Sequence, residues 1–170
     1  MKKTFLLIIT FLTISAGSLS AQRTGYINSQ SVLNEVPEYV AATQQIERLR
    51  KQYESQVQSE MKRVEELYNK YQQQKNSLSQ SQKREAESQI ISLERSAKEL
   101  QKSFFGQEGA LSVRSRELLE PVMTRLETVV KEIAESEDLG MVIDISAMQG
   151  VIYYNPRYDL SKRVLEMMNQ

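Results

Sequence analysis

Two stretches in the middle of the chain decide the predicted fold: VQSEMKRVEELYNKY at residues 57–71 and IISLERSAKELQKSF at residues 90–104. Five residues of the first stretch are spaced by 4, 3, 4 and 3 positions: Val57, Met61, Val64, Tyr68 and Tyr71. Five residues of the second are spaced by 3, 4, 3 and 4: Ile90, Leu93, Ala97, Leu100 and Phe104. Either spacing places these side chains on one face of an α-helix. The two series are mirror images about a point between Gln80 and Ser81. The spacing therefore predicts an antiparallel helical hairpin with its tip near residues 80–81.

The hairpin belongs to a long region without strand signals, and we predict that its arm spans residues 37–121. A single helix of this length needs a partner to bury its apolar stripe. Ser79 and Gln82 match a capping box, which indicates a helix start at the tip. The predicted opposed pairs are Val57 with Phe104, Met61 with Leu100, Val64 with Ala97, Tyr68 with Leu93, and Tyr71 with Ile90. The alternative is one continuous helix that pairs with another subunit.

The returning side of the hairpin carries helix-breaking residues. Gly106 and Gly109 each cost a helix interior about 1 kcal/mol relative to Ala. This segment is therefore a hinge, a place where helices approach closely, or a weak spot without function. Pro121 is expected to kink or restart the helix. An amphipathic stretch then follows, residues 122–133, which we expect to pack on a head.

The two ends of the mature chain predict that head, residues 22–36 and 122–170. Strands are expected at residues 24–28, 141–145 and 151–154, and short helices at residues 29–36 and 160–168. Asn28 or Ser29 suits the N-cap of the first helix, and Asp159 that of the last. The fold class is thus α+β and mostly α. Because three short strands leave open edges and a thin core, we expect oligomerisation through the head.

Composition limits the function. Residues 1–21 read as a secretory signal with a basic start, an apolar run and small residues before the cleavage site. Removing them leaves 20 basic and 22 acidic residues, a net charge of −2, which gives no global attraction for nucleic acid. His and Cys are absent, so the commonest metal ligands and general bases are missing. We expect an exported protein that is not an enzyme and uses no cofactor.

Several segments resemble the OmpH-like family of periplasmic chaperones. They are GYIN at residues 25–28, LLEP at 118–121, DLGMVID at 138–144, GVIYYN at 150–155 and YDLSKRVL at 158–165. The resemblance implies a homotrimer in which strands from three subunits build a shared β-body. Three hairpins project from that body around a cavity that holds unfolded outer-membrane proteins without nucleotide or metal. The function implied is an ATP-independent periplasmic holdase, with outer-membrane association left open; the alternative is a structural coiled-coil adaptor of the cell envelope.

Three residue groups carry this hypothesis. The resemblance places one group in the trimer body, although its members could also form head core within one subunit: Tyr26, Ile27, Val142, Ile143, Ile145, Val151, Ile152 and Tyr153. Side chains outside the hairpin stripe are expected either to touch clients or to be only partly exposed without a function: Tyr53, Leu67, Leu78, Ile91 and Phe105. Tyr53 is included because it opposes Glu108 in the predicted register. Residues 70–84 contain four basic and no acidic residues. This basic tip is either a solvated helix end or a site for anionic lipid headgroups or client segments: Lys70, Lys75, Lys83 and Arg84.

Overall fold

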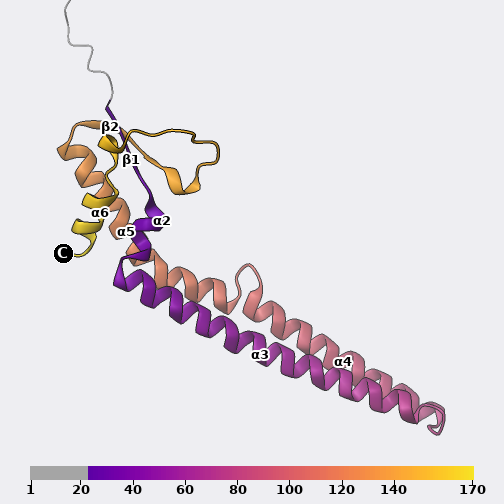
Figure 1. Ribbon diagram of the computed structural model, residues 1–170. Coiled ribbons are helices and arrows are strands. Elements are labelled where there is room, and N and C mark those ends of the chain that lie inside the picture. Colours follow the sequence, from indigo (N-terminus) through magenta and orange to yellow (C-terminus); the bar gives the residue numbers. More distant parts are fainter. Residues whose placement is uncertain (1–22) are drawn as a thin grey trace, which may run out of the picture. The chain divides into compact units, whose positions relative to one another are not determined.

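The computed structural model describes residues 23–170, which divide into two compact units. The arm unit comprises Leu33–Leu126, and the head unit comprises the described residues up to Val32 together with Glu127–Gln170. Figure 1 shows the order of the helices and strands along the chain. The predicted secretory signal, residues 1–21, lies outside the described residues.

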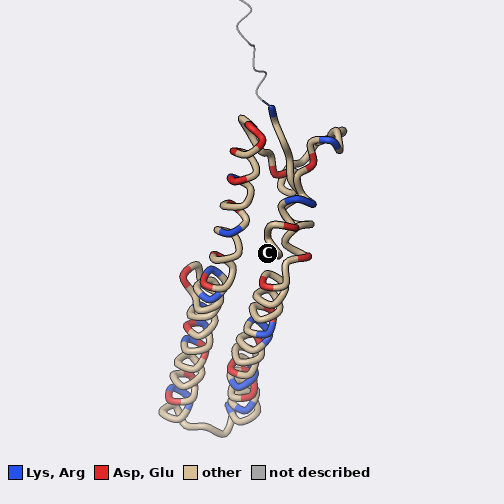
Figure 2. Tube along the Cα trace, turned by 90° about the vertical axis from the view of Figure 1, so that its left-hand side faces the viewer, with Lys and Arg blue, Asp and Glu red and all other residues tan. Residues whose placement is uncertain are grey.

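The arm unit is built on two long helices, α3 at Pro37–Gln74 and α4 at Gln80–Phe105. They lie side by side and antiparallel in both views (Figures 1 and 2). Ala97 is 1 % exposed, and Tyr71 and Ile90 are also buried, so the predicted stripe is the contact face. The hairpin prediction is therefore confirmed, and the alternative of one continuous helix is wrong.

The turn of the hairpin lies earlier than predicted, at residues 75–79. The Gln82 backbone N–H donates to the Ser79 hydroxyl at 3.4 Å, and the Ser79 N–H donates to the Gln82 side-chain oxygen at 2.9 Å. The predicted capping box is thus confirmed. Because it begins α4 at Gln80, the tip lies before residues 80–81 rather than at them.

The register of the two helices differs from the predicted one by about one helical turn. Phe104 stacks on Tyr53, four residues before its predicted partner. The Tyr71 hydroxyl donates to Glu87, three residues before its predicted partner. A slide of three or four residues keeps the same helix face in contact, so apolar spacing predicts the face but not the register. Tyr68 is 49 % exposed, so its predicted burial in the seam is wrong.

The returning helix is interrupted at the two glycines. The Gly106 N–H donates to the Lys102 carbonyl oxygen at 2.8 Å where α4 ends, and α5 begins at Ala110. A Cβ atom on Gly109 would lie 2.7 Å from the Phe104 carbonyl oxygen, closer than real Cβ contacts allow. Glycine is therefore required here by the close approach of the backbone to itself. The segment that the sequence predicts to weaken the helix is a complete break between α4 and α5.

Pro121 lies inside α5, which runs without interruption from Ala110 to Ser136. The predicted restart of the helix at this residue is wrong. Proline removes one N–H donor from the helix interior, and at this exposed position the helix continues across it. The four residues of the predicted stripe that follows it are buried: Val122, Leu126, Val129 and Ile133.

The head unit contains two parallel strands, β1 at Arg23–Ile27 and β2 at Leu139–Asp144, and both were predicted. Gly25 pairs with Val142, and the Leu160 N–H donates to the Tyr26 carbonyl oxygen at 2.9 Å. Neighbours thus flank β1 on both sides. Within residues 23–170, the outer edge of β2 has no strand beside it.

The third predicted strand, residues 151–154, is wrong for the single chain. Ile145 already leaves the strand for a 3-10 turn, η1 at Ile145–Ala147, and a second turn, η2, covers Pro156–Tyr158. Between them the chain forms no sheet, and Ile152 is 99 % exposed. A strand needs a neighbour for its backbone hydrogen bonds, and the described part of the chain offers none at this place.

Two short helices follow, α2 at Ser29–Asn34, which begins in the head unit, and α6 at Ser161–Met168, which lies within it. The Asn28 side chain accepts a hydrogen bond from the Ser31 N–H at 3.0 Å, as an N-cap should. The Asp159 side chain accepts one from the Ser161 N–H at 2.9 Å, although α6 begins one residue later than predicted. The buried apolar residues of strands and helices in this unit are Tyr26, Ile27, Val32, Val129, Ile133, Leu160, Val164 and Met168.

Candidate functional site

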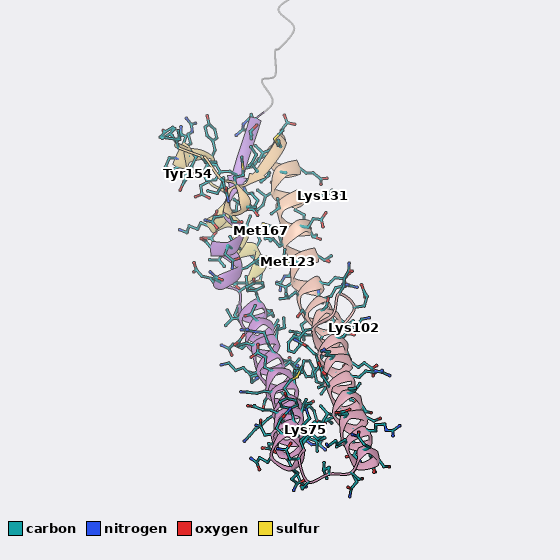
Figure 3. The ribbon with its side chains drawn as sticks, turned by 90° about the vertical axis from the view of Figure 1, so that its right-hand side faces the viewer. Lys75, Lys102, Met123, Lys131, Tyr154 and Met167 are labelled. Carbon is teal, nitrogen blue, oxygen red and sulfur yellow. The ribbon has the colours of Figure 1, made fainter. Side chains whose placement is uncertain are left out.

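The four basic tip residues lie at the end of α3, in the turn and in the first turns of α4. Lys70, Lys75 and Arg84 are exposed, and Lys83 is half-buried. The Lys75 ammonium, labelled in Figure 3, lies 5.8 Å from the centre of the Tyr71 ring. Among the described residues, none of the four forms an ion pair, whereas charges of both signs alternate along the rest of the hairpin (Figure 2). The tip therefore presents positive side chains that are free of ion pairs with other described residues.

A pocket of about 190 Å³ lies beside these charges, between the end of α3 and the start of α4. It brings together two of the predicted client-contacting residues, Leu67 and Leu78, although they are eleven positions apart in the sequence. Tyr71 and Ala86 complete its apolar lining. Tyr71 is buried and the other three are half-buried, so these residues form the inner wall.

The remaining lining of this tip pocket is polar and exposed. It consists of Lys70, Gln74, Gln82, Glu85 and Gln89. The amide oxygen of Gln82 is engaged in the capping box, whereas the Gln74 and Gln89 amides make no hydrogen bond to another described side chain. Each helix therefore has one side-chain amide beside the apolar wall that is not hydrogen-bonded to another described side chain.

Tyr71 fixes the two helices next to the pocket. Its hydroxyl donates to the Glu87 carboxylate, and this bond, with burial of the ring, raises the pKa of Tyr71 above its ordinary value of 10.0. A hydrogen bond to a charged acceptor contributes more than one between neutral groups. The contact holds the end of α3 against α4 within two turns of the tip.

Three aromatic rings meet where α4 ends. The Tyr53 ring stacks on Phe104, with centroids 4.2 Å apart and planes at 9°. The Phe105 ring stands edge-on to both, with centroids 6.4 Å from each. The prediction that Tyr53 faces outward opposite Glu108 is therefore wrong, because the register shift places its ring in the seam.

Two residues predicted to touch clients are exposed on α4. Ile91 is 57 % exposed, and Phe105 is 37 % exposed even though its edge meets the two other rings. They are fourteen positions apart, which places them on the same helix face. Their exposure agrees with the sequence prediction, and their contact with clients stays a prediction.

The residues expected in an oligomer body fall into three groups in the single chain. Tyr26 and Ile27 are 7 % and 5 % exposed and belong to the head core. Half-buried residues lie along and just after β2: Val142, Ile143 and Ile145. Exposed residues lie in the segment that forms no strand: Val151, Ile152 and Tyr153. Only the last group is a free apolar surface.

The exposed segment also covers an unsatisfied polar group. The Tyr154 ring, labelled in Figure 3, lies 4.9 Å from the Tyr26 ring. Among residues 23–170 the buried Tyr26 hydroxyl has no hydrogen-bond partner, and burial is the main cause that raises its pKa above 10.0. A buried hydroxyl without a partner costs about 1–3 kcal/mol, so this part of the head is not fully satisfied by the described residues.

Asp144 ties the end of β2 to the start of α2. Its carboxylate accepts hydrogen bonds from the Ser29 N–H at 3.1 Å, the Ser29 hydroxyl at 2.5 Å and the Ser146 N–H at 3.0 Å. Partial burial by itself would raise the pKa of Asp144, but these bonds outweigh it and hold the pKa below its ordinary value of 3.8. The contact is structural and positions the strand edge.

Sequence reasoning missed the tip pocket and three exposed residues of the head, Met141, Met148 and Tyr154. The pocket depends on the helix register, which spacing does not determine. Met141 and Tyr154 carry a signal in the sequence, because they directly adjoin the predicted body residues Val142 and Tyr153. Within residues 23–170, every helix is too short or too polar to cross a bilayer.

Comparison with known proteins identifies a solved structure with a similar fold. The chain is similar to a crystal structure from Caulobacter crescentus CB15 described as an outer membrane chaperone (OmpH-like). The TM-score is 0.66 at 10 % sequence identity, with 89 % of this chain and 86 % of that chain covered. This likeness shows that the two share a fold of long helices with a small sheet. No significant match was found among curated proteins.

The family follows from the sequence itself. The family model "Outer membrane protein (OmpH-like)" matches residues 23–168, nearly the whole described chain. The chain therefore belongs to the OmpH-like family, and the resemblance noted in the sequence is confirmed. Membership in this family indicates a chaperone role.

Proposed function

We propose that this protein is an ATP-independent periplasmic holdase that binds unfolded outer-membrane proteins and prevents their aggregation. The observation that carries the proposal is the exposed apolar surface on an arm whose own stripe is already buried. Ala97 is almost fully buried in the hairpin seam, whereas Ile91 on the same helix is 57 % exposed. An arm built only as a spacer would gain nothing from that exposed side chain.

Weak contacts suit a holdase. Full burial of one apolar side chain of this size is worth about 1.5–3 kcal/mol, so a single contact releases its client readily. Several such contacts on linked arms act together through effective concentration. Retention therefore depends on the number of arms more than on any one residue.

Several arms require self-association, and the head supports it. The outer edge of β2 is unpaired in the described chain, and the segment at residues 151–154 exposes apolar side chains without strand partners. Open strand edges are usually paired or covered. We propose that Val151, Ile152 and Tyr153 pair with another copy in a homotrimer, with Val142 and Ile143 at the joined edge.

The basic tip is proposed as a second contact site for anionic groups on clients or lipid headgroups. Its four basic side chains are free of ion pairs among the described residues, and they lie at the far end of the hairpin from Pro37 and Phe105. Such a charge cluster attracts anions over about a Debye length, roughly 8 Å at physiological salt. The attraction should weaken as salt rises.

An aggregation assay tests the function. A denatured β-barrel membrane protein is diluted from urea with and without the mature chain, and light scattering is followed over time. The proposal predicts suppressed scattering at one oligomer per client without ATP. No suppression at any ratio would contradict it and would favour a structural adaptor with one folded partner.

A further inference from the structure

The tip pocket between α3 and α4 was not expected from the sequence, and it has the features of a discrete binding site. Its inner wall is apolar, formed by Leu67, Leu78 and Ala86 together with the buried Tyr71. Its volume is about 190 Å³. An apolar protein cavity of about 150 Å³ accommodates a benzene molecule. The pocket is therefore large enough for one aromatic ring.

The pocket rim has the chemistry of a peptide-group partner. Gln74 on α3 and Gln89 on α4 each present an amide that can donate and accept at once. A peptide group next to a bound side chain offers the same pair of functions, one N–H and one C=O. Amides on both sides of an apolar pocket can therefore bind the backbone of any sequence whose side chain enters it.

We infer that the tip pocket binds one aromatic side chain of an unfolded polypeptide and holds the adjacent backbone through Gln74 and Gln89. The Tyr71 ring in the wall adds an aromatic contact, which is worth more than its buried area alone. Lys70 and Glu85 at the rim are of opposite charge, so the pocket itself selects for no charged group. This inference rests on the proposed chaperone function and specifies the ligand class at one place on the arm.

The pocket can be closed with one substitution. Ala86 is half-buried in the lining, and Leu at this position fills apolar space while favouring helix. Ser92→Leu is the matched control, because it adds the same side chain at an exposed position of α4 outside the pocket. A double variant, Gln74→Ala with Gln89→Ala, leaves the wall unchanged and removes both amides.

The test is a methyl NMR titration of the full mature chain with N-acetyl-phenylalaninamide, using N-acetyl-glycinamide as the reference. The expected dissociation constant is on the order of 1 mM for a ligand of this size, with shifts at the Leu67, Leu78 and Ala86 methyl groups. Ala86→Leu should weaken binding at least fivefold, the double glutamine variant about threefold, and Ser92→Leu not at all. Equal binding by wild type and Ala86→Leu, measured by the Leu67 shifts, would overturn the inference.

Two further outcomes separate the alternatives. Shifts that appear only with phosphatidylglycerol vesicles, and not with the phenylalanine probe, would show that lipid occupies the pocket and would also overturn the inference. If the chain protects a denatured β-barrel but does not bind the phenylalanine probe, the pocket assignment fails while the holdase function stands. If the chain binds the probe but protects no client, the function fails and the pocket remains only a binding site.

Discussion

The arm and the head use their apolar residues in opposite ways. In the arm, the seam of α3 and α4 buries Tyr71, Ile90 and Ala97 within one chain. In the head, Ile152 is 99 % exposed, and within residues 23–170 the Tyr26 hydroxyl lacks a partner and β2 has no strand at its outer edge. The arm thus buries its seam within one chain, whereas the head leaves apolar side chains and a strand edge exposed. The difference teaches that assembly should depend on the head and client contact on the arm.

The largest expected effect comes from placing a charge on the exposed head segment. Ile152→Asp should prevent self-association, because an unpaired carboxylate buried between subunits costs several kcal/mol. Ile91→Asp is the matched control, since it places the same charge on an exposed apolar residue of the arm. Light scattering should give a monomer for the first variant and the wild-type mass for the second. The same mass for both variants would contradict the claim that assembly depends on the head rather than on the arm.

The next effect lies at the helix break of the arm. Gly109→Ala should lower the free energy of unfolding by about 2 kcal/mol, because the new Cβ would meet the Phe104 carbonyl oxygen at 2.7 Å. Urea denaturation followed by circular dichroism measures this change. Gln107→Ala, an exposed change in the same loop, should move the midpoint little. If both variants unfold at the same urea concentration, the backbone approach at Gly109 is not a constraint.

Client protection should respond to the exposed face of α4. Ile91→Ser with Phe105→Ser removes two weak contacts and should raise the amount of chaperone needed for half-maximal protection by about threefold to tenfold, with oligomer mass unchanged. Gln101→Ser, an exposed polar change on the same helix, serves as the control. An unchanged protection curve would remove these residues from the client surface.

A smaller effect concerns pH. The pKa of Asp144 is lowered in the folded state, so its stabilising contribution is present above its unfolded value of 3.8 and is lost as pH falls through the folded value. Asp144→Asn should therefore cost about 1 kcal/mol at pH 7 and progressively less below pH 4. Urea midpoints of both proteins at pH 7 and pH 3 measure the difference. A gap between them that stays constant with pH would contradict the hydrogen-bond network at Ser29.

An effect of similar size is predicted at the tip. Tyr71→Phe removes the hydrogen bond to Glu87 and should lower the free energy of unfolding by about 0.5–1.5 kcal/mol. Hydrogen exchange of amides in the first turns of α4 should show this locally. Tyr68→Phe is the control, because that ring is half exposed. Equal exchange in both variants would mean that the Glu87 contact does not hold the tip.

Sequence predicted more of the arm than of the head. Helical spacing is local, so the hairpin, its buried face and the capping box at Ser79 could be read directly. The register could not, because a slide of one turn keeps the same helix face in contact, so the partner of Phe104 and the place of the tip were predicted wrongly. In the head, residues 151–154 have the composition of a strand. A strand forms only where another backbone is available to pair with it. The tip pocket was missed for the same reason as the register.

Mass in solution tests most directly whether the head is completed by other copies of the chain. Multi-angle light scattering of the mature protein at micromolar concentration should give three times the mass of one mature chain, and Ile152→Asp should reduce it to one. A wild-type protein that remains a monomer across the accessible concentration range would contradict the account, because a single arm cannot surround a client.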